Sequence, residues 1–81
     1  MKKPEIKPGG AYSNGEFGNR WSLRQVVAIE PGPGLPDQDL VLFKVLAGTG
    51  RRARLTCTRA EFMRWARYEV VRNENSWERV Q

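Results

Sequence analysis

The chain has 81 residues, with 14 lysines and arginines against 9 aspartates and glutamates, a formal net charge of +5, and no histidine. This length suits a single domain and leaves no room for a second, because domains below about 40 residues rarely fold without disulfides or metals. The single cysteine, Cys57, excludes an internal disulfide framework, and no stretch approaches the roughly 20 apolar residues of a membrane span.

The beginning of the chain predicts a flexible arm followed by a small hairpin. Residues 1–8 hold two prolines and three lysines with only Ile6 to bury, which favours a mobile arm. They carry no apolar segment typical of a secretion signal, so we expect a cytoplasmic protein without a membrane partner. Residues 14–15, Asn-Gly, favour a tight turn and predict a hairpin over residues 12–17.

Residues 20–30 alternate between apolar and polar side chains as a strand does. Gln25 interrupts the apolar face, which predicts a bulge at that position. The apolar side chains expected on this face of the strand are Trp21, Leu23, Val27 and Ile29. The next segment, residues 31–39, contains three prolines and two glycines and is expected to form a surface loop.

Residues 40–47 and 51–58 predict a second hairpin around a three-residue loop, Gly48-Thr49-Gly50. In this register facing residues have numbers that sum to 98, so the apolar face pairs Val41 with Cys57, Phe43 with Leu55 and Val45 with Ala53. A two-residue loop would instead bury threonine and arginine against apolar partners, at about 1–3 kcal/mol for each unsatisfied group.

A capping box, Thr58 to Glu61, predicts a short helix that begins after Thr58. Phe62, Trp65 and Ala66 have the spacing of one helix face and are expected to face the core. Residues 68–72 are rich in strand formers and predict the last strand. We therefore expect the domain to cover residues 9–72 and residues 73–81 to form a polar tail that exposes Trp77.

This order of elements resembles the five-stranded SH3-like barrel with one short helix before the last strand. Three segments, residues 8–12, 39–45 and 57–62, also resemble small uncharacterised bacterial proteins of this kind. The resemblance implies a mainly β barrel and little about the ligand, because such barrels bind proline-rich peptides, RNA, DNA and modified protein tails. The acidic cluster and paired tyrosines that hold polyproline are absent here, so we do not expect that ligand.

The residue types argue against catalysis. Without histidine, proton transfer near neutral pH would need a strongly shifted carboxyl or amine, so we expect no enzyme activity and no cofactor. Cys57 is expected to be a core residue rather than a nucleophile. Asp37 and Asp39 are too few oxygen ligands for a metal site, so none is expected.

The same register points to a basic surface opposite the apolar face. It sets Lys44 against Arg54 and Leu46 against Arg52, which places two cations within about 5 Å of each other without an acidic residue on either strand. Either a carboxylate reaching over from Glu61, Glu69 or a neighbouring strand neutralises such a pair, or the surface binds an anion such as a phosphate. The predicted nucleic-acid-binding residues, with Tyr12 or Trp21 as a stacking ring, are Lys44, Arg51, Arg52, Arg54, Arg20 and Arg24.

Two alternatives stay open at this stage. The arginines can be an ordinary solvated surface that protects a strand edge from aggregation. The protein can instead bind another protein through the apolar strand face formed by Leu40, Leu42 and Leu46, which holds more leucine than a solvated surface needs.

Overall fold

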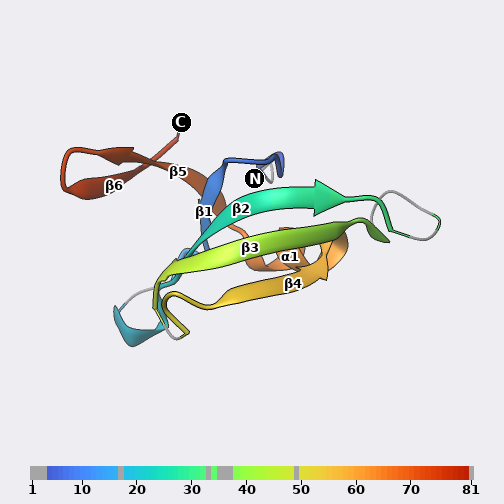
Figure 1. Ribbon diagram of the computed structural model, residues 1–81. Coiled ribbons are helices and arrows are strands. Elements are labelled where there is room, and N and C mark those ends of the chain that lie inside the picture. The colour runs from blue at the N-terminus through green and yellow to red at the C-terminus, as the bar shows by residue number, and fades with distance from the viewer. Residues whose placement is uncertain (1–3, 17, 33, 35–37, 49, 81) are drawn as a thin grey trace.

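The protein folds into one antiparallel sheet with a single short α-helix packed against one of its faces (Figure 1). The computed structural model describes residues 4–80 except Phe17, Pro33, residues 35–37 and Thr49. For Asn19 it describes the backbone but not the side chain. Its elements are β1 (Ala11–Ser13), the 3-10 helix η1 (Gly18–Arg20), β2 (Leu23–Glu30), β3 (Leu40–Ala47), β4 (Arg54–Thr58), α1 (Arg59–Trp65), β5 (Tyr68–Asn73) and β6 (Ser76–Arg79).

The sheet is open, with the strand order β4-β3-β2-β1-β5-β6. The mainly β class and the short helix between strands agree with the sequence prediction. The five-stranded closed barrel is not confirmed, because six strands are present and the outer strands β4 and β6 do not pair with each other.

The main core lies between the sheet and α1, on what we call the helix face. Phe62 of α1 is fully buried there, and its ring meets those of Tyr12 and Phe43 edge-on at centroid distances of 5.6 and 5.5 Å. Val26, Val41 and Val45 complete the wall that the sheet contributes. No described helix packs over the opposite surface, here called the outer face (Figure 1).

A second, smaller cluster covers one end of the outer face. Ala11, Leu23 and Val70 form its centre, and Trp21, Leu46, Ala47, Tyr68 and Trp77 pack around them. Ala11 and Tyr12 are neighbours in β1 and belong to different clusters, as alternation along a strand requires. Both sides of β1 are therefore buried.

β2 departs from simple alternation. Its register against β3 shifts between Leu23 and Arg24 and again between Val26 and Ala28, on either side of the predicted bulge at Gln25. The second shift moves Val27 out of the predicted apolar face, and its side chain is 51% exposed. The inward position belongs to Val26 instead, which is buried.

The predicted register between β3 and β4 is confirmed where the two strands pair, over Leu40–Lys44 and Arg54–Thr58, whereas the predicted pair of Leu46 and Arg52 is absent from these pairs because Arg52 lies in the connecting turn. Val41 lies opposite Cys57 and Phe43 opposite Leu55, while Lys44 lies opposite Arg54 on the other face. The connecting loop is longer than the predicted three residues, because β4 begins at Arg54 rather than at residue 51.

Two turns close this loop. The Arg51 amide donates to the Gly48 carbonyl at 3.2 Å, and the Ala53 amide donates to the Gly50 carbonyl at 2.8 Å. Arg52, within the second of these turns, has a positive φ of 73°. The predicted loop residue Thr49 lies outside the described residues.

The capping box forms as predicted. The Thr58 hydroxyl accepts from the Glu61 amide at 3.1 Å, and the Glu61 carboxylate accepts from the Thr58 amide at 3.0 Å. These contacts lower the pKa of the Glu61 carboxyl, because hydrogen bonds from Thr58 favour its charged form. Phe62 and Ala66 are buried and Trp65 packs partly against them, so the predicted helix face is confirmed.

Described residues near both ends of the chain pack in the fold, where the sequence predicts a mobile arm and a polar tail. Ile6, in the predicted flexible arm, is buried in the main core and only 3% exposed. The predicted polar tail contains β6, which pairs with β5, and Trp77 is half-buried against the smaller cluster. Interactions distant in sequence account for both differences, since neither segment contains enough apolar residues to order itself.

The predicted hairpin over residues 12–17 is wrong, although its last residue, Phe17, lies outside the described residues. β1 pairs with β2 and with β5 rather than with the segment that follows it. Asn14 instead organises a longer loop, because its side chain donates to the Arg20 carbonyl and accepts from the Ser22 amide.

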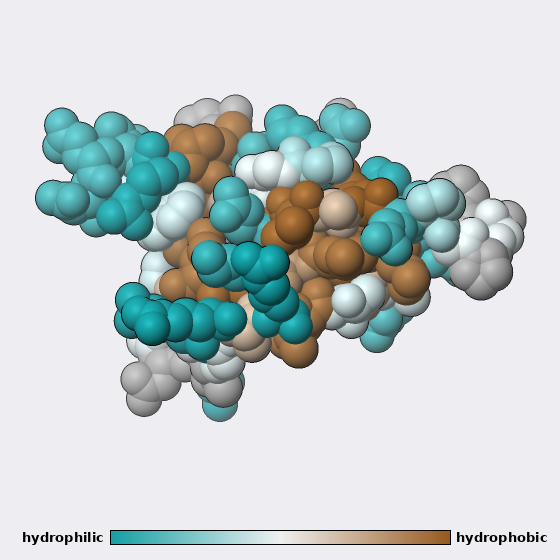
Figure 2. All heavy atoms as spheres, viewed as in Figure 1, coloured by the Kyte–Doolittle hydropathy of each residue, from teal (hydrophilic) through white to brown (hydrophobic). Residues whose placement is uncertain are grey.

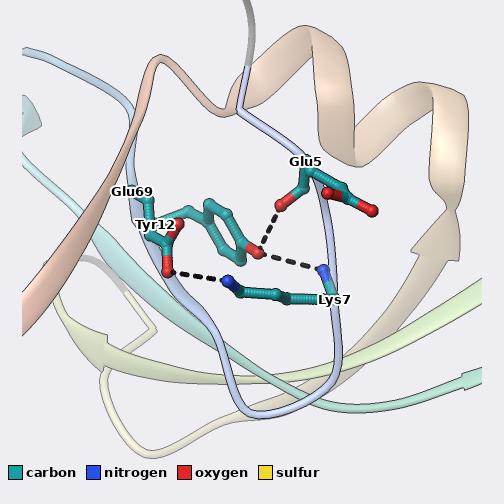
Figure 3. A network of polar contacts seen from close by, with 4 residues as sticks. All are labelled: Glu5, Lys7, Tyr12 and Glu69. Atoms are coloured by element: carbon teal, nitrogen blue, oxygen red, sulfur yellow. Dashed lines mark hydrogen bonds and ion pairs between the residues drawn. The ribbon is translucent and has the colours of Figure 1, made fainter. Parts of the chain in front are cut away.

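The Tyr12 hydroxyl fastens the N-terminal segment to the sheet (Figure 3). It donates to the Glu5 carbonyl at 2.7 Å and accepts from the Lys7 amide at 3.0 Å, while the Lys7 ammonium lies 3.7 Å from the Glu69 carboxylate. Position 10 must be glycine for this geometry, because a Cβ there would stand 2.5 Å from the Tyr12 hydroxyl.

Replacing Tyr12 with phenylalanine should lower the free energy of unfolding by about 1–3 kcal/mol, because the Lys7 amide and Glu5 carbonyl lose their shared partner. Urea denaturation followed by tryptophan fluorescence measures the change. Glu69→Gln is the control: it removes only the partly exposed ion pair and should change stability by less than about 1 kcal/mol. A Tyr12→Phe variant as stable as the parent would contradict the role given to the hydroxyl.

The same tyrosine predicts a loss of stability in alkali. Burial raises the pKa of Tyr12 above its ordinary value of 10.0, so the folded chain holds this proton to higher pH than the unfolded chain. Its contribution is therefore constant below about pH 10 and falls as the pH rises from there through the folded pKa. In urea titrations between pH 8 and 11, the advantage of the parent over Tyr12→Phe should shrink only above pH 10. An advantage that stays constant would contradict the raised pKa.

Candidate nucleic-acid interface

Two opposed cations stand on the outer face, where β3 and β4 pair. Lys44 lies directly opposite Arg54 and also faces Gln25 of β2. Arg54 is exposed and Lys44 is half-buried. Among the described residues, no carboxylate lies within ion-pair distance of either cation. The ion pair between Lys7 and Glu69 lies in another part of the structure. The charge of this pair is left to solvent or to a ligand.

Three further cations lie at the end of the sheet where β3 turns into β4. Arg51 and Arg52 are exposed within that turn, and Arg20 is exposed at the end of η1. The two segments touch: a Cβ on Gly48 would lie 2.6 Å from the Trp21 carbonyl oxygen. The η1 segment and the β3–β4 turn therefore occupy the same end of the molecule (Figure 1). We call Lys44, Arg54, Arg51, Arg52 and Arg20 the basic surface.

Arg24 does not belong to this surface, so its assignment as a nucleic-acid-binding residue is not supported by its position. Its guanidinium carbon lies 4.0 Å from the Trp65 ring centroid and 4.6 Å from that of Phe43, on the helix face. The Nε atom is buried and has no hydrogen-bond partner among the described residues, and burial lowers the pKa of the guanidinium. The register of β2 against β3 shifts between Leu23 and Arg24, directly before Arg24 in the strand. The residue pattern did not reveal this shift.

An apolar area lies beside the cations. Figure 2 shows apolar atoms gathered over the middle of β2, β3 and β4, with hydrophilic residues toward the β3–β4 turn. The sequence pattern did not predict that Val27 belongs to this area. The register shift in β2 leaves its side chain about half exposed. A shallow hollow of about 120 Å³ is lined by Val27, Leu42, Phe43, Arg54, Leu55 and Thr56.

The three leucines predicted to form an apolar face do not act together. Leu40 and Leu42 are half-buried on the outer face, whereas Leu46 packs against the smaller cluster. The helix covers the other side of the sheet. The accessible apolar surface is therefore centred on Val27 and Leu42.

Neither ring proposed for base stacking is free on this surface. Tyr12 is fully buried on the helix face, and Trp21 is half-buried against the smaller cluster. Among the described residues, the side chains of this surface that could contact a base are aliphatic side chains and the arginine guanidinium groups.

Cys57 faces Val41, as predicted, and packs half-buried against the main core. Burial raises the pKa of its thiol, although the charge of Arg24 acts in the opposite direction. A raised pKa leaves little thiolate near neutral pH.

The acidic residues do not gather into a metal-binding group. Of the two loop aspartates, Asp37 lies outside the described residues, and the Asp39 carboxylate accepts from the Gly32 amide at 3.2 Å. Within the described part of the chain, no three histidine, cysteine or acidic side chains are grouped as metal ligands.

Comparison with protein families, curated proteins and solved structures finds no match to this chain. None of the described helices has the length and apolar character needed to span a membrane.

Reversing the charge of Lys44 should stabilise the fold. Lys44→Glu replaces two opposed cations by an opposite-charge pair with Arg54, which is worth about 0.2–1 kcal/mol. Urea denaturation at low salt measures the gain, which should diminish at high salt. Arg64→Glu makes the same change in net charge on the exposed side of α1 and is the control. A Lys44→Glu variant that is less stable than the parent would show that the pair is already neutralised.

Arg24→Ala should lower the free energy of unfolding by about 2 kcal/mol, because a half-buried guanidinium between two rings loses its cation–π contacts and its packed stem. Thermal or urea unfolding measures the loss. The exposed Arg20→Ala should change stability by less than about 0.5 kcal/mol. Equal effects of the two changes would argue against the stacked position of Arg24.

Proposed function

We propose that this protein is a noncatalytic binding module that holds single-stranded nucleic acid on the outer face of its sheet. The observation that carries the proposal is the opposed pair of half-buried Lys44 and exposed Arg54, which has no acidic partner among the described residues. Like charges facing each other across two strands destabilise a sheet. A phosphate between the two side chains reverses the sign of that interaction.

The rest of the basic surface supports a ligand with several negative charges. Arg51, Arg52 and Arg20 extend it from β3 and β4 toward the end of the sheet. The net charge of +5 favours the approach of a polyanion as well. A chain of phosphates fits this arrangement better than a single small anion does.

The apolar area supports a single strand over a duplex. Val27 and Leu42 lie next to the cations, so a ligand there would present apolar surface beside its phosphates. Unpaired nucleotides do so with the faces of their bases, which in a duplex are stacked inside. The absence of histidine from the sequence supports a role in binding rather than catalysis.

A protein partner is the second candidate, and the 51% exposure of Val27 beside the half-buried Leu42 favours it. Contact with another protein would depend on these apolar side chains and only weakly on salt. Val27→Ser therefore separates the candidates: it should leave a phosphate-dominated interaction largely intact and weaken a protein interface centred on this residue.

Fluorescence anisotropy with labelled 12-nucleotide RNA, single-stranded DNA and duplex DNA tests the proposal. Binding to the single strands should weaken as salt rises, with a log–log slope of about −0.7 for each phosphate neutralised. Lys44→Glu and Arg54→Glu should each weaken binding about tenfold or more, whereas the matched Arg64→Glu on α1 should weaken it far less. No binding at 50 mM salt, or an equal loss in all three variants, would refute the nucleic-acid role.

A further inference from the structure

A second group of cations lies on the outer face, near the edge of the sheet opposite β4 (Figure 1). Alternation along β5 places Tyr68 and Arg72 on the same side as Val70, which belongs to the smaller cluster. In β6, Trp77 lies opposite Arg72. Arg79 lies opposite Val70. We call four of these side chains the cation–aromatic surface: Tyr68, Arg72, Trp77 and Arg79.

The charges of the β5–β6 hairpin are sorted by face. By the same alternation, the acidic residues of the two strands, Glu69 and Glu78, lie on the opposite side. There Glu69 pairs with Lys7, and the Glu78 carboxylate accepts from the side-chain amide of Asn73 at 3.0 Å. Among the described residues, no carboxylate lies within ion-pair distance of Arg72. The outer side of the hairpin therefore suits an anionic ligand.

Each arginine of this surface lies over an aromatic ring. The guanidinium carbon of Arg72 is 5.4 Å from the Trp77 ring centroid, and its Nε donates to the Glu74 carbonyl at 3.0 Å. The guanidinium carbon of Arg79 is 4.7 Å from the Tyr68 centroid. Both rings are half-buried against the smaller cluster, whereas both arginines are exposed. A guanidinium held over a ring offers its outer plane to a base, because bases stack on guanidinium planes as well as on aromatic rings.

One row of cross-strand neighbours joins the cation–aromatic surface to the basic surface. The pairs run from β4 to β6 in the order Arg54, Lys44, Gln25, Ala11, Val70 and Arg79. With strands about 4.8 Å apart, the row is about 24 Å long. A polyanion that crosses the sheet along this row therefore meets cations at both ends.

The middle of the row is uncharged and partly apolar. Ala11 and Val70 are buried in the smaller cluster, and the half-buried rings of Trp21 and Trp77 pack around them. The faces of unpaired bases can cover such a surface, whereas a duplex presents its charged backbones. The row therefore suits a single strand over a duplex.

We propose that a single strand bound at the basic surface continues along this row and stacks its bases on the cation–aromatic surface. The inference rests on the proposed function, since it extends the same ligand across the sheet. Stacked nucleotides stand about 3.4 Å apart, so the row spans about seven of them. A strand that reaches both surfaces binds more tightly than one that reaches a single surface, because the second contact is intramolecular.

Fluorescence anisotropy with a 12-nucleotide RNA and a trinucleotide tests the span. The trinucleotide cannot reach both surfaces. Since the longer strand offers about ten positions to a site of three nucleotides, a single surface would favour it only about tenfold. The parent should favour the longer strand about a hundredfold or more, and Arg72→Glu should reduce this preference to about tenfold. The matched Arg64→Glu on α1 should retain it. A preference of about tenfold in the parent overturns the proposal.

Two further readouts separate this inference from the proposed function. If Lys44→Glu weakens binding of the longer strand while Arg72→Glu binds it like the parent, the nucleic-acid role stands and the extension across the sheet is overturned. No binding by the parent refutes both. In the parent, the nitrogen–proton signal of the Trp77 indole, identified by its loss in Trp77→Phe, should shift when the longer strand binds. A signal that stays in place at saturation overturns the proposal, whether or not Arg72→Glu folds.

Discussion

The structure depends on the burial of one aromatic side chain, Phe62. Its ring contacts Tyr12 and Phe43 from the sheet, and Trp65 of its own helix lies at a centroid distance of 5.5 Å. Edge-on aromatic contacts add to the free energy gained by removing such large side chains from water. α1 has only seven residues, and Phe62 is its buried side chain, so this contact largely holds the helix on the sheet, while the capping box fixes where the helix begins.

The shortness of the helix explains why the two faces of the sheet differ. One helix and the N-terminal segment cover the helix face, whereas only the β1 end of the outer face is covered, by the smaller cluster. The rest of the outer face is formed by β2, β3 and β4 and meets solvent. That is where Lys44, Arg54 and Val27 come together, so the binding surface that we propose is the part of the sheet over which no described element lies.

The local parts of this fold could be predicted from the sequence, and the long-range parts could not. The register of β3 and β4 follows from alternation on two strands close in the chain, and the helix start follows from Thr58 and Glu61. Ile6 could not be placed, because its partners come from β1, β2, β3 and α1. β6 could not be predicted either, because its residues are mostly polar and Trp77 packs against the smaller cluster, which comes from distant parts of the chain.

The candidate site shows the same division. Lys44 and Arg54 were correctly placed opposite each other, because the hairpin register decides that contact. Arg24 was misplaced and the exposure of Val27 was missed, since two register shifts in β2 change which side of the strand each residue occupies. A bulge inserts one extra residue into a strand, so the side chains of all residues beyond it switch to the opposite face of the sheet. The residue types alone do not show where the bulge lies.

The length of β1 limits how the two halves of the sheet are joined. With three residues, it is the only strand between β2 and β5, so the sheet narrows there to three paired positions on each side. The clusters on the two faces meet across this strand without sharing a side chain. The β5–β6 hairpin is therefore joined to β2, β3 and β4 by few backbone pairs, and the side chains of Val70 and Trp77, packed with Leu23 in the smaller cluster, supply the rest of that connection.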